Sequence, residues 1–297
     1  MQLLAFIIIY PVLWLISLLP LKILYIFSDA LYFLAYRVIK YRKKTVRLNL
    51  KIALPDLTDK ERLKIEKKFY HHFCDLLVEM IKIFTISEKE IKKRYIFSNI
   101  DTITNLEKQG KSFVVLTSHF GNYEWLLLMN KYLTSHKGFG VYKKINNKYF
   151  DKLVRDIRGR FDAELIDTKQ TIPVMKQNQR NNVLGCYGFI TDQSPKIYKV
   201  PYWGNFFNME VPIHVGGEIM AKKLDMNIVF VKAKKIKRGY YSAAFIPYEK
   251  NVKETPNFEI TDAYLRMLEQ QIRENPEYYL WTHKRFKHSR GFYNKAD

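Results

Sequence analysis

Short apolar segments rich in β-branched and aromatic residues alternate with amphipathic segments from residue 112 onward, and this alternation limits the possible folds more than any other feature. The apolar segments have the length of strands, and the segments between them carry apolar residues at helical spacing. Because neighbouring parallel strands need a crossover that is usually a helix, the pattern predicts an α/β domain with a mostly parallel central sheet flanked by helices. The predicted strands are 112–118, 138–143, 163–167, 182–190, 227–236 and 240–248, and the predicted helices are 122–133, 147–161, 171–180, 214–224 and 261–275.

Two further segments complete this outline. A capping-box pair, Thr58 and Glu61, predicts the start of a long amphipathic helix within 55–85. Residues 191–212 hold three prolines and one glycine and are expected to form a loop.

The beginning of the chain has a different composition. Residues 1–21 carry no charge but include Pro11 and Pro20, and a second apolar run, 23–36, carries only Asp29. About 20 apolar residues cross a bilayer as a helix, and a basic cluster such as 37–51 marks the cytoplasmic side. We therefore expect residues 1–50 to be an N-terminal hydrophobic helical membrane anchor with a basic juxtamembrane segment, followed by one further domain, 51–297. Whether the anchor spans, loops back or lies in the interface is open, and a buried core helix is the alternative.

Charge and cysteine content narrow the function. The net charge of +21 predicts an anionic partner, which could be nucleic acid, an acidic protein or anionic lipid. No nucleic-acid-binding signature is present, so we expect no nucleic acid. Cys74 and Cys186 are the only cysteines and belong to no zinc-ligand pattern, which argues against a disulfide scaffold and a metal site.

The stretch TSHFGNYEW, residues 117–125, places His119 and Glu124 five positions apart between a predicted strand and a predicted helix. Gly121 permits a tight bend and Asn122 is a good N-cap, so the two ionisable side chains can meet across the turn. A carboxylate that holds one imidazole nitrogen leaves the other as a proton acceptor. No nucleophile of the protein is apparent, so this base would activate a hydroxyl or an amine of the substrate for direct transfer. The alternative is a capped helix whose His–Glu hydrogen bond is only structural.

Several blocks in order resemble the bacterial lipid A biosynthesis (late, lauroyl/myristoyl-type) acyltransferase family, within the H-x4-D/E lysophospholipid-type acyltransferases. They are TSHFGNYEW, GVYKKINNKYFDKLVRDIRGRF, GFITDQSP, VPYWGNFF and PEYYLWTHKRFKHSR, preceded by an apolar start and YRKKTVRLNLKIALPD. The resemblance covers nearly the whole chain and implies a glycerolipid-acyltransferase-like fold. No Phe-Pro-Glu-Gly-Thr block is present, which argues against glycerol-3-phosphate as the acceptor.

The resemblance also implies residue roles. His119 matches the family's catalytic base, and Glu124 matches its orienting carboxylate. Arg158, or its neighbour Arg160, matches an arginine that could clamp a phosphate through two hydrogen bonds. Asp192, with Gln193, matches the acid of the family's Asp-containing loop and is a candidate to face the substrate, with an Asx turn as the alternative. Our own candidates for stabilising the oxyanion are Asn122 and the backbone around Gly121.

The resulting hypothesis is a membrane-associated O-acyltransferase at the cytoplasmic face of the bacterial inner membrane. It would move a fatty acyl group from acyl carrier protein to a hydroxyl of an acylated lipid, a lipid A precursor, beside an anionic phospholipid surface. No metal or organic cofactor is expected, because the thioester supplies the driving force. The alternatives are an aminolipid or glycolipid acceptor, or a non-catalytic membrane lipid-binding protein.

Overall fold

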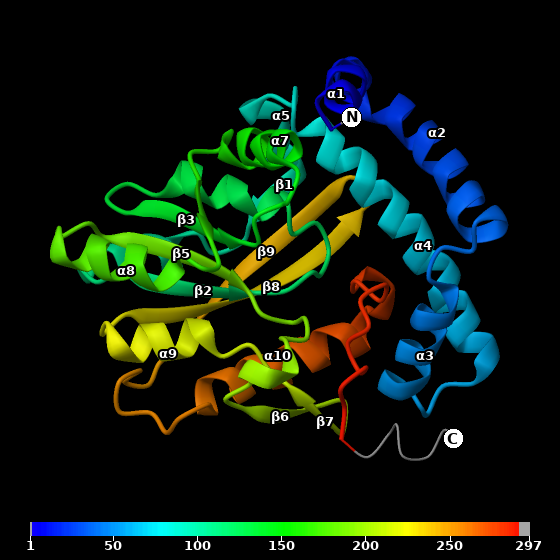
Figure 1. Ribbon diagram of the computed structural model, residues 1–297. Helices are drawn as coiled ribbons and strands as arrows, with labels where there is room; N and C mark the ends of the chain where they lie inside the picture. The colour runs from blue at the N-terminus through cyan, green and yellow to red at the C-terminus, as the bar shows by residue number, and fades with distance from the viewer. Residues whose placement is uncertain (1, 291–297) are drawn as a thin grey trace.

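The computed structural model describes residues 2–290, and its centre is a seven-stranded sheet in the order β1-β9-β8-β2-β5-β3-β4 (Figure 1). The neighbouring strands are parallel except β8 and β9, which form an antiparallel pair. The prediction of an α/β fold with a mostly parallel central sheet flanked by helices is confirmed. The strands are β1 Tyr95–Phe97, β2 Phe113–Thr117, β3 Lys137–Tyr142, β4 Glu164–Asp167, β5 Gly185–Ile190, β8 Asn227–Lys237 and β9 Tyr240–Pro247.

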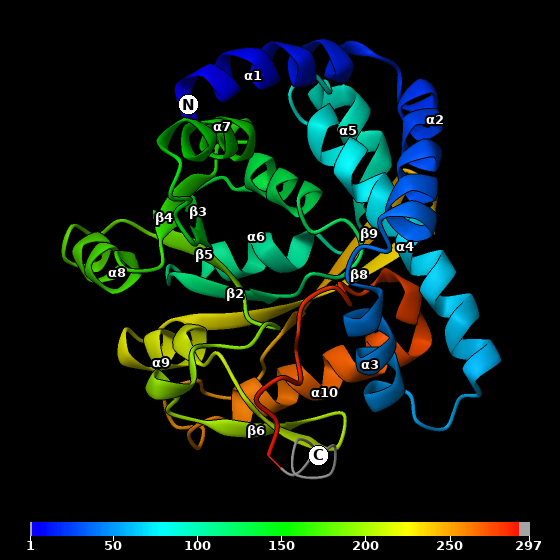
Figure 2. The ribbon, with the colours of Figure 1, turned by 45° about the vertical axis from the view of Figure 1, so that its right-hand side comes forward.

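Strand β2 shows why the sheet is covered on both faces. All five of its residues are buried, as expected for a central parallel strand with an unbroken apolar sequence. Phe113 and Val115 join one core with α6, whereas Val114 and Leu116 join a second core with α9 and α10. Figure 2 shows α6 on one side of the sheet and α9 and α10 on the other. The helices of these layers are α6 Asp101–Lys108, α7 Lys148–Gly159, α8 Thr171–Arg180, α9 Gly216–Lys223 and α10 Glu259–Glu274.

Some local predictions need correction. The predicted helix 122–133 is a 3-10 helix, η2 Trp125–Tyr132, which begins three residues later. Within the expected loop 191–212 lie a short 3-10 turn, η3 Ile197–Lys199, and a hairpin of β6 Trp203–Phe206 with β7 Met209–Pro212. Strand β1 and helix α6 were not predicted, because each is short and its apolar pattern covers only two or three positions.

The N-terminal third forms helices that pack on this domain. They are α1 Gln2–Leu18, α2 Leu21–Tyr32, the π-helical η1 Phe33–Val38, α3 Lys43–Ala53, α4 Asp59–Lys82 and α5 Glu88–Arg94. The predicted capping box is confirmed, because the Thr58 side chain accepts from the Glu61 backbone N–H and the Glu61 side chain accepts from the Thr58 backbone N–H. Helix α2 lies along α4 (Figure 1), with Leu21 and Leu24 buried and Ser28 Oγ donating to Asp75 Oδ1 over 2.8 Å.

The predicted N-terminal hydrophobic membrane anchor is wrong. Among residues 2–290, no helix has both the length and the apolar character needed to cross a bilayer. The uncharged run is divided near Pro20, and the 17 residues of α1 extend over only about 26 Å, less than the ~30 Å of a hydrocarbon core. The predicted boundary between residues 50 and 51 stays a prediction.

Candidate active site

Two neighbouring parallel strands deliver a histidine and an aspartate to the same edge of the sheet. Strands β2 and β5 pair in register, with Thr117 opposite Ile190 at their carboxyl ends. Two residues beyond these partners come His119 and Asp192. Since parallel strands end at the same edge, side chains 73 positions apart in sequence become neighbours. In open α/β sheets this carboxyl edge is the usual place for a ligand.

The His119 imidazole is held by the Asp192 carboxylate. Nδ1 of His119 lies 2.8 Å from Oδ1 of Asp192, and the backbone N–H of His119 donates to the same oxygen over 3.2 Å. The Asp192 side chain is 1% exposed, whereas that of His119 is 18% exposed. Burial would raise the pKa of the Asp192 carboxyl, but His119 and its hydrogen bonds outweigh burial and hold that pKa below its usual range. A carboxylate accepting from Nδ1–H leaves Nε2 as a proton acceptor.

Glu124 makes a different ion pair from the one expected. Its two oxygens accept from Nε and Nη2 of Arg158, at 2.9 and 2.5 Å. Among the hydrogen bonds of residues 2–290 there is none between Glu124 and His119, so the predicted pair is replaced by His119–Asp192. Glu124 does not reach His119 because it stands at the start of η2, where its side chain faces α7 and Arg158 on that helix. Arg158 is likewise no free phosphate clamp, since two of its nitrogens already bind Glu124.

The oxyanion candidates of the turn are also engaged. Gly121 has φ +60°, as its place in a tight bend requires, and its N–H donates to the Tyr278 carbonyl over 2.9 Å. The Asn122 side chain is 1% exposed, and its Oδ1 accepts from the backbone N–H of Trp125, the first residue of η2, over 3.0 Å. The N-cap of η2 is Glu124, so the N-cap prediction for Asn122 is wrong, although Asn122 bonds to the first residue of η2; neither group is free for an oxyanion in this structure.

Of the two remaining candidates, Gln193 lies beside His119 and Arg160 does not. Gln193 lies against the His119 ring, with its Nε2 at 3.3 Å from Nε2 and 3.4 Å from Nδ1 of His119. Arg160 instead donates to the Ile83 carbonyl, just after α4. Of the two arginines left open by the sequence, Arg158 is the one near the catalytic turn.

The C-terminal segment fixes both halves of the site, which the sequence did not predict. Leu280 N–H donates to the His119 carbonyl over 3.1 Å, so residues 278–280 pair with the catalytic turn. The Ser194 N–H donates to Nε2 of His283 over 3.1 Å, and Ser194 Oγ donates to the Arg285 carbonyl over 2.7 Å. Burial lowers the pKa of His283 to about 4, which keeps Nε2 able to accept. The aromatic and basic block 276–290 was the available signal, but its partners lie far away in sequence.

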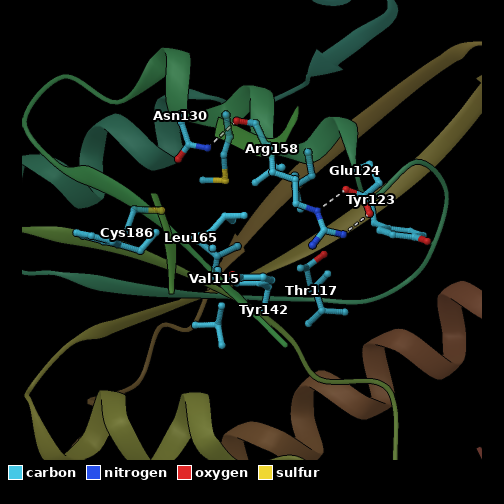
Figure 3. Close-up of a pocket in the computed structure, with 17 residues that line it drawn as sticks. Val115, Thr117, Tyr123, Glu124, Asn130, Tyr142, Arg158, Leu165 and Cys186 are labelled. Carbon is cyan, nitrogen blue, oxygen red and sulfur yellow. Dashed lines mark hydrogen bonds and ion pairs between the residues drawn. The ribbon is translucent and has the colours of Figure 1, made fainter. Parts of the chain in front are cut away.

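An apolar pocket lies beside the carboxyl ends of β2 and β5 and is lined by Thr117 and Ile190 among other residues. It lies between strands β2, β3 and β5 on one side and η2 and α7 on the other, and Figure 3 shows Glu124 and Tyr123 at one end and Asn130 and Cys186 at the other. The Arg158 guanidinium points toward Glu124 at the first end (Figure 3). Most of the lining is apolar, and its aliphatic residues are Val115, Leu126, Leu127, Val141, Leu165 and Ile190. A pocket of this composition suits a hydrocarbon chain.

Comparison with known proteins gives the class of the enzyme. The family described as bacterial lipid A biosynthesis acyltransferase matches residues 2–288. The chain therefore belongs to this family, and its activity is that of an acyltransferase in lipid A biosynthesis.

Individual relatives agree with that assignment. The chain is 26% identical over 280 residues to a lipid A biosynthesis lauroyltransferase of Escherichia coli (strain K12), covering 93% of this chain and 89% of the relative. It is 23% identical over 292 residues to a lipid A biosynthesis palmitoleoyltransferase of the same strain, with the same two coverages. A lipid A biosynthesis acyltransferase of Shigella flexneri is also 23% identical.

Proposed function

We propose that this chain transfers a fatty acyl group from the thioester of acyl carrier protein to a hydroxyl of an acylated lipid A precursor, with His119 as the general base. The observation that carries the proposal is the His119–Asp192 pair, 2.8 Å between Nδ1 and Oδ1, at the carboxyl edge of the sheet in a member of an acyltransferase family. We assign the orienting role to Asp192 and give Glu124 the task of holding Arg158.

The proposed reaction needs no nucleophile from the protein. The acceptor hydroxyl attacks the thioester carbonyl carbon while its proton passes to Nε2 of His119. The resulting imidazolium is stabilised by the buried Asp192 carboxylate. Collapse of the tetrahedral intermediate breaks the carbon–sulfur bond, and His119 returns the proton to the departing thiolate of the carrier. The products are the lipid ester and the free carrier thiol.

The pocket supports a donor with a long hydrocarbon chain. Its lining includes Thr117 and Ile190, the residues two positions before His119 and Asp192. An acyl chain lying in the pocket would therefore bring its thioester toward the catalytic pair. The guanidinium of Arg158, fixed by Glu124, lies at this end, and its Nη1 is not part of the pair with Glu124. We assign to Arg158 a contact with an anionic or carbonyl oxygen of the substrate.

Charge supports the proposed partners. The net charge of +21 suits an acidic carrier protein, an acceptor with phosphates and an anionic lipid surface. Because the acceptor is a lipid and the carrier is a soluble protein, we place the reaction at the cytoplasmic face of the bacterial inner membrane.

Purified full-length protein, carrier protein loaded with a labelled acyl chain and an acylated lipid A precursor test the proposal. Wild type should form the acylated lipid, and His119→Ala should be slower by about 10²- to 10⁴-fold. Equal rates would show that His119 is not the base. A parallel reaction with an aminolipid tests the acceptor, since transfer to that lipid alone would contradict a lipid A precursor and leave the base assignment intact.

A further inference from the structure

A buried glutamate lies directly behind the catalytic turn. Glu79 is in the last two turns of α4 and is 0% exposed. A carboxylate removed from water is costly unless hydrogen bonds and charges compensate for the lost hydration. The hydrogen-bond partners of the Glu79 carboxylate therefore indicate which part of the structure this residue stabilises.

Two of the contacts of Glu79 go to the catalytic turn. The Asn122 side-chain amide donates to Oε2 of Glu79 over 2.7 Å, and the Trp125 indole N–H donates to the Glu79 carbonyl over 3.2 Å. Asn122 itself accepts from the Trp125 backbone N–H. Asn122 is three residues after His119, and the bend at Gly121 lies between them. Glu79, Asn122 and Trp125 thus form a closed set of hydrogen bonds on the buried side of the turn that carries the base.

The remaining contacts fix the carboxylate from other directions. Tyr25 of α2 donates to Oε1 and Tyr241 of β9 donates to Oε2, each over 2.8 Å. Burial raises the pKa of Glu79 to about 7, opposed chiefly by the charge of Lys235 on β8. The ionised form suits the geometry, because the Asn122 side-chain NH2 group, which faces Glu79, can only donate. The other charged or titratable groups around this network are His72 and Asp75 of α4, Asp29 of α2, Arg94 of α5 and Arg238 after β8.

We propose that Glu79 is a positioning residue, which acts through Asn122 to fix the turn on which His119 lies. The inference rests on the proposed role of His119 as base, and it goes further because Glu79 acts through Asn122 and makes no hydrogen bond to His119 among residues 2–290. A turn held from behind keeps the imidazole in place during proton transfer, and a displacement of about 1 Å in such a group can reduce the rate about 10²-fold.

The kinetic test compares Glu79→Ala, Asn122→Ala and the double variant in the acyl-transfer assay. Each single change should lower kcat by about 10- to 100-fold and change KM by less than about threefold, because the substrate contacts are retained. The double variant should be no slower than the slower single variant within about threefold, because the two residues act as one unit. Multiplicative losses would contradict action through Asn122.

Two further variants separate positioning from stability. Glu79→Gln keeps an acceptor for Asn122, so its kcat should be at least about fivefold above that of Glu79→Ala. Ser28→Ala is the matched control, because it removes a buried 2.8 Å hydrogen bond between the same two helices, α2 and α4, away from the turn. It should lower the unfolding temperature while kcat stays at the wild-type value. If Ser28→Ala slows kcat as much as Asn122→Ala does, the effect is general destabilisation and the proposal fails.

A spectroscopic readout decides the inference without substrate. In ¹⁵N-histidine-labelled full-length protein, the His119 imidazole signals are assigned by their loss in His119→Ala. Asn122→Ala and Glu79→Ala should shift or broaden them, and Ser28→Ala should leave them unchanged. If Glu79→Ala fails to fold, Asn122→Ala and Glu79→Gln still decide the outcome. Unchanged His119 signals in Asn122→Ala would overturn the proposal, whereas absence of transfer by wild type would count against the proposed function alone.

Discussion

Replacement of Asp192 by asparagine isolates the negative charge behind the catalytic base. The ring Nδ1–H and the backbone N–H of His119 donate to the same oxygen, Oδ1 of Asp192, at 2.8 and 3.2 Å respectively. An asparagine in the same rotamer can offer its carbonyl oxygen to both donors, so the ring should keep its tautomer and orientation. The variant therefore loses the carboxylate charge and little else.

The magnitude follows from the geometry. Two unit charges 2.8 Å apart attract by about 6 kcal/mol at an effective dielectric constant of about 20. Both charges are delocalised, over the imidazolium ring and over two carboxylate oxygens, which increases the mean separation and reduces the attraction to about 3 kcal/mol at the same dielectric constant. Because this attraction exists only when His119 is protonated, it acts on the transition state. A loss of about 3 to 6 kcal/mol corresponds to a decrease in kcat of about 10²- to 10⁴-fold.

The assay is acyl transfer from loaded carrier protein to the lipid A precursor at saturating concentrations of both, with Glu124→Gln as the matched comparison. Asp192→Asn should show the large loss in kcat, and Glu124→Gln should mainly affect substrate binding through Arg158. If Asp192→Asn retains kcat within about threefold of wild type while Glu124→Gln loses it, the orienting carboxylate is Glu124 and the reasoning here is refuted.

Three other predictions concern the surroundings of the site. Burial lowers the pKa of His283 from 6.5 to about 4, so its contribution to stability is complete above pH 6.5 and is lost as the pH falls toward 4. After allowance for solvent screening this amounts to about 2 kcal/mol, and denaturant unfolding at pH 7 and pH 5 should show a smaller pH effect in His283→Gln, which still accepts from Ser194 N–H. Gly140→Val should shift donor preference toward shorter acyl chains, measured as kcat/KM over a series of loaded carriers, because a Cβ there would lie 3.0 Å from Leu165 Cδ2 inside the pocket. Arg158→Lys should lower kcat/KM by about 10-fold, since lysine cannot form the two-pronged pair with Glu124, and an unchanged value would remove Arg158 from the substrate site.

Local patterns predicted the parts of the site that depend on neighbouring residues in sequence. The apolar run before Thr117 indicated a buried strand, and Gly121 indicated the bend that its φ of +60° confirms. Asn122 was expected to bond to the start of the next helix, and its Oδ1 does accept from Trp125 N–H, a contact between groups only three positions apart, although the N-cap itself is Glu124. The alternation of strands and helices was sufficient for the α/β class, since it reflects two different local periodicities.

The sequence by itself therefore determined six of the seven strands of the central sheet, the turn and the position of His119, all of which follow from interactions over a few residues. Only the tertiary structure decided which carboxylate holds the imidazole. Glu124 is near in sequence but faces Arg158, whereas Asp192, 73 positions away, is brought beside His119 because β2 and β5 are neighbours in the sheet. The tertiary structure also divided the apolar N-terminal run near Pro20 into α1 and α2, and no helix among residues 2–290 has both the length and the apolar character needed to cross a bilayer. Strand order and helix packing depend on contacts between distant segments, and no pattern within one segment encodes them.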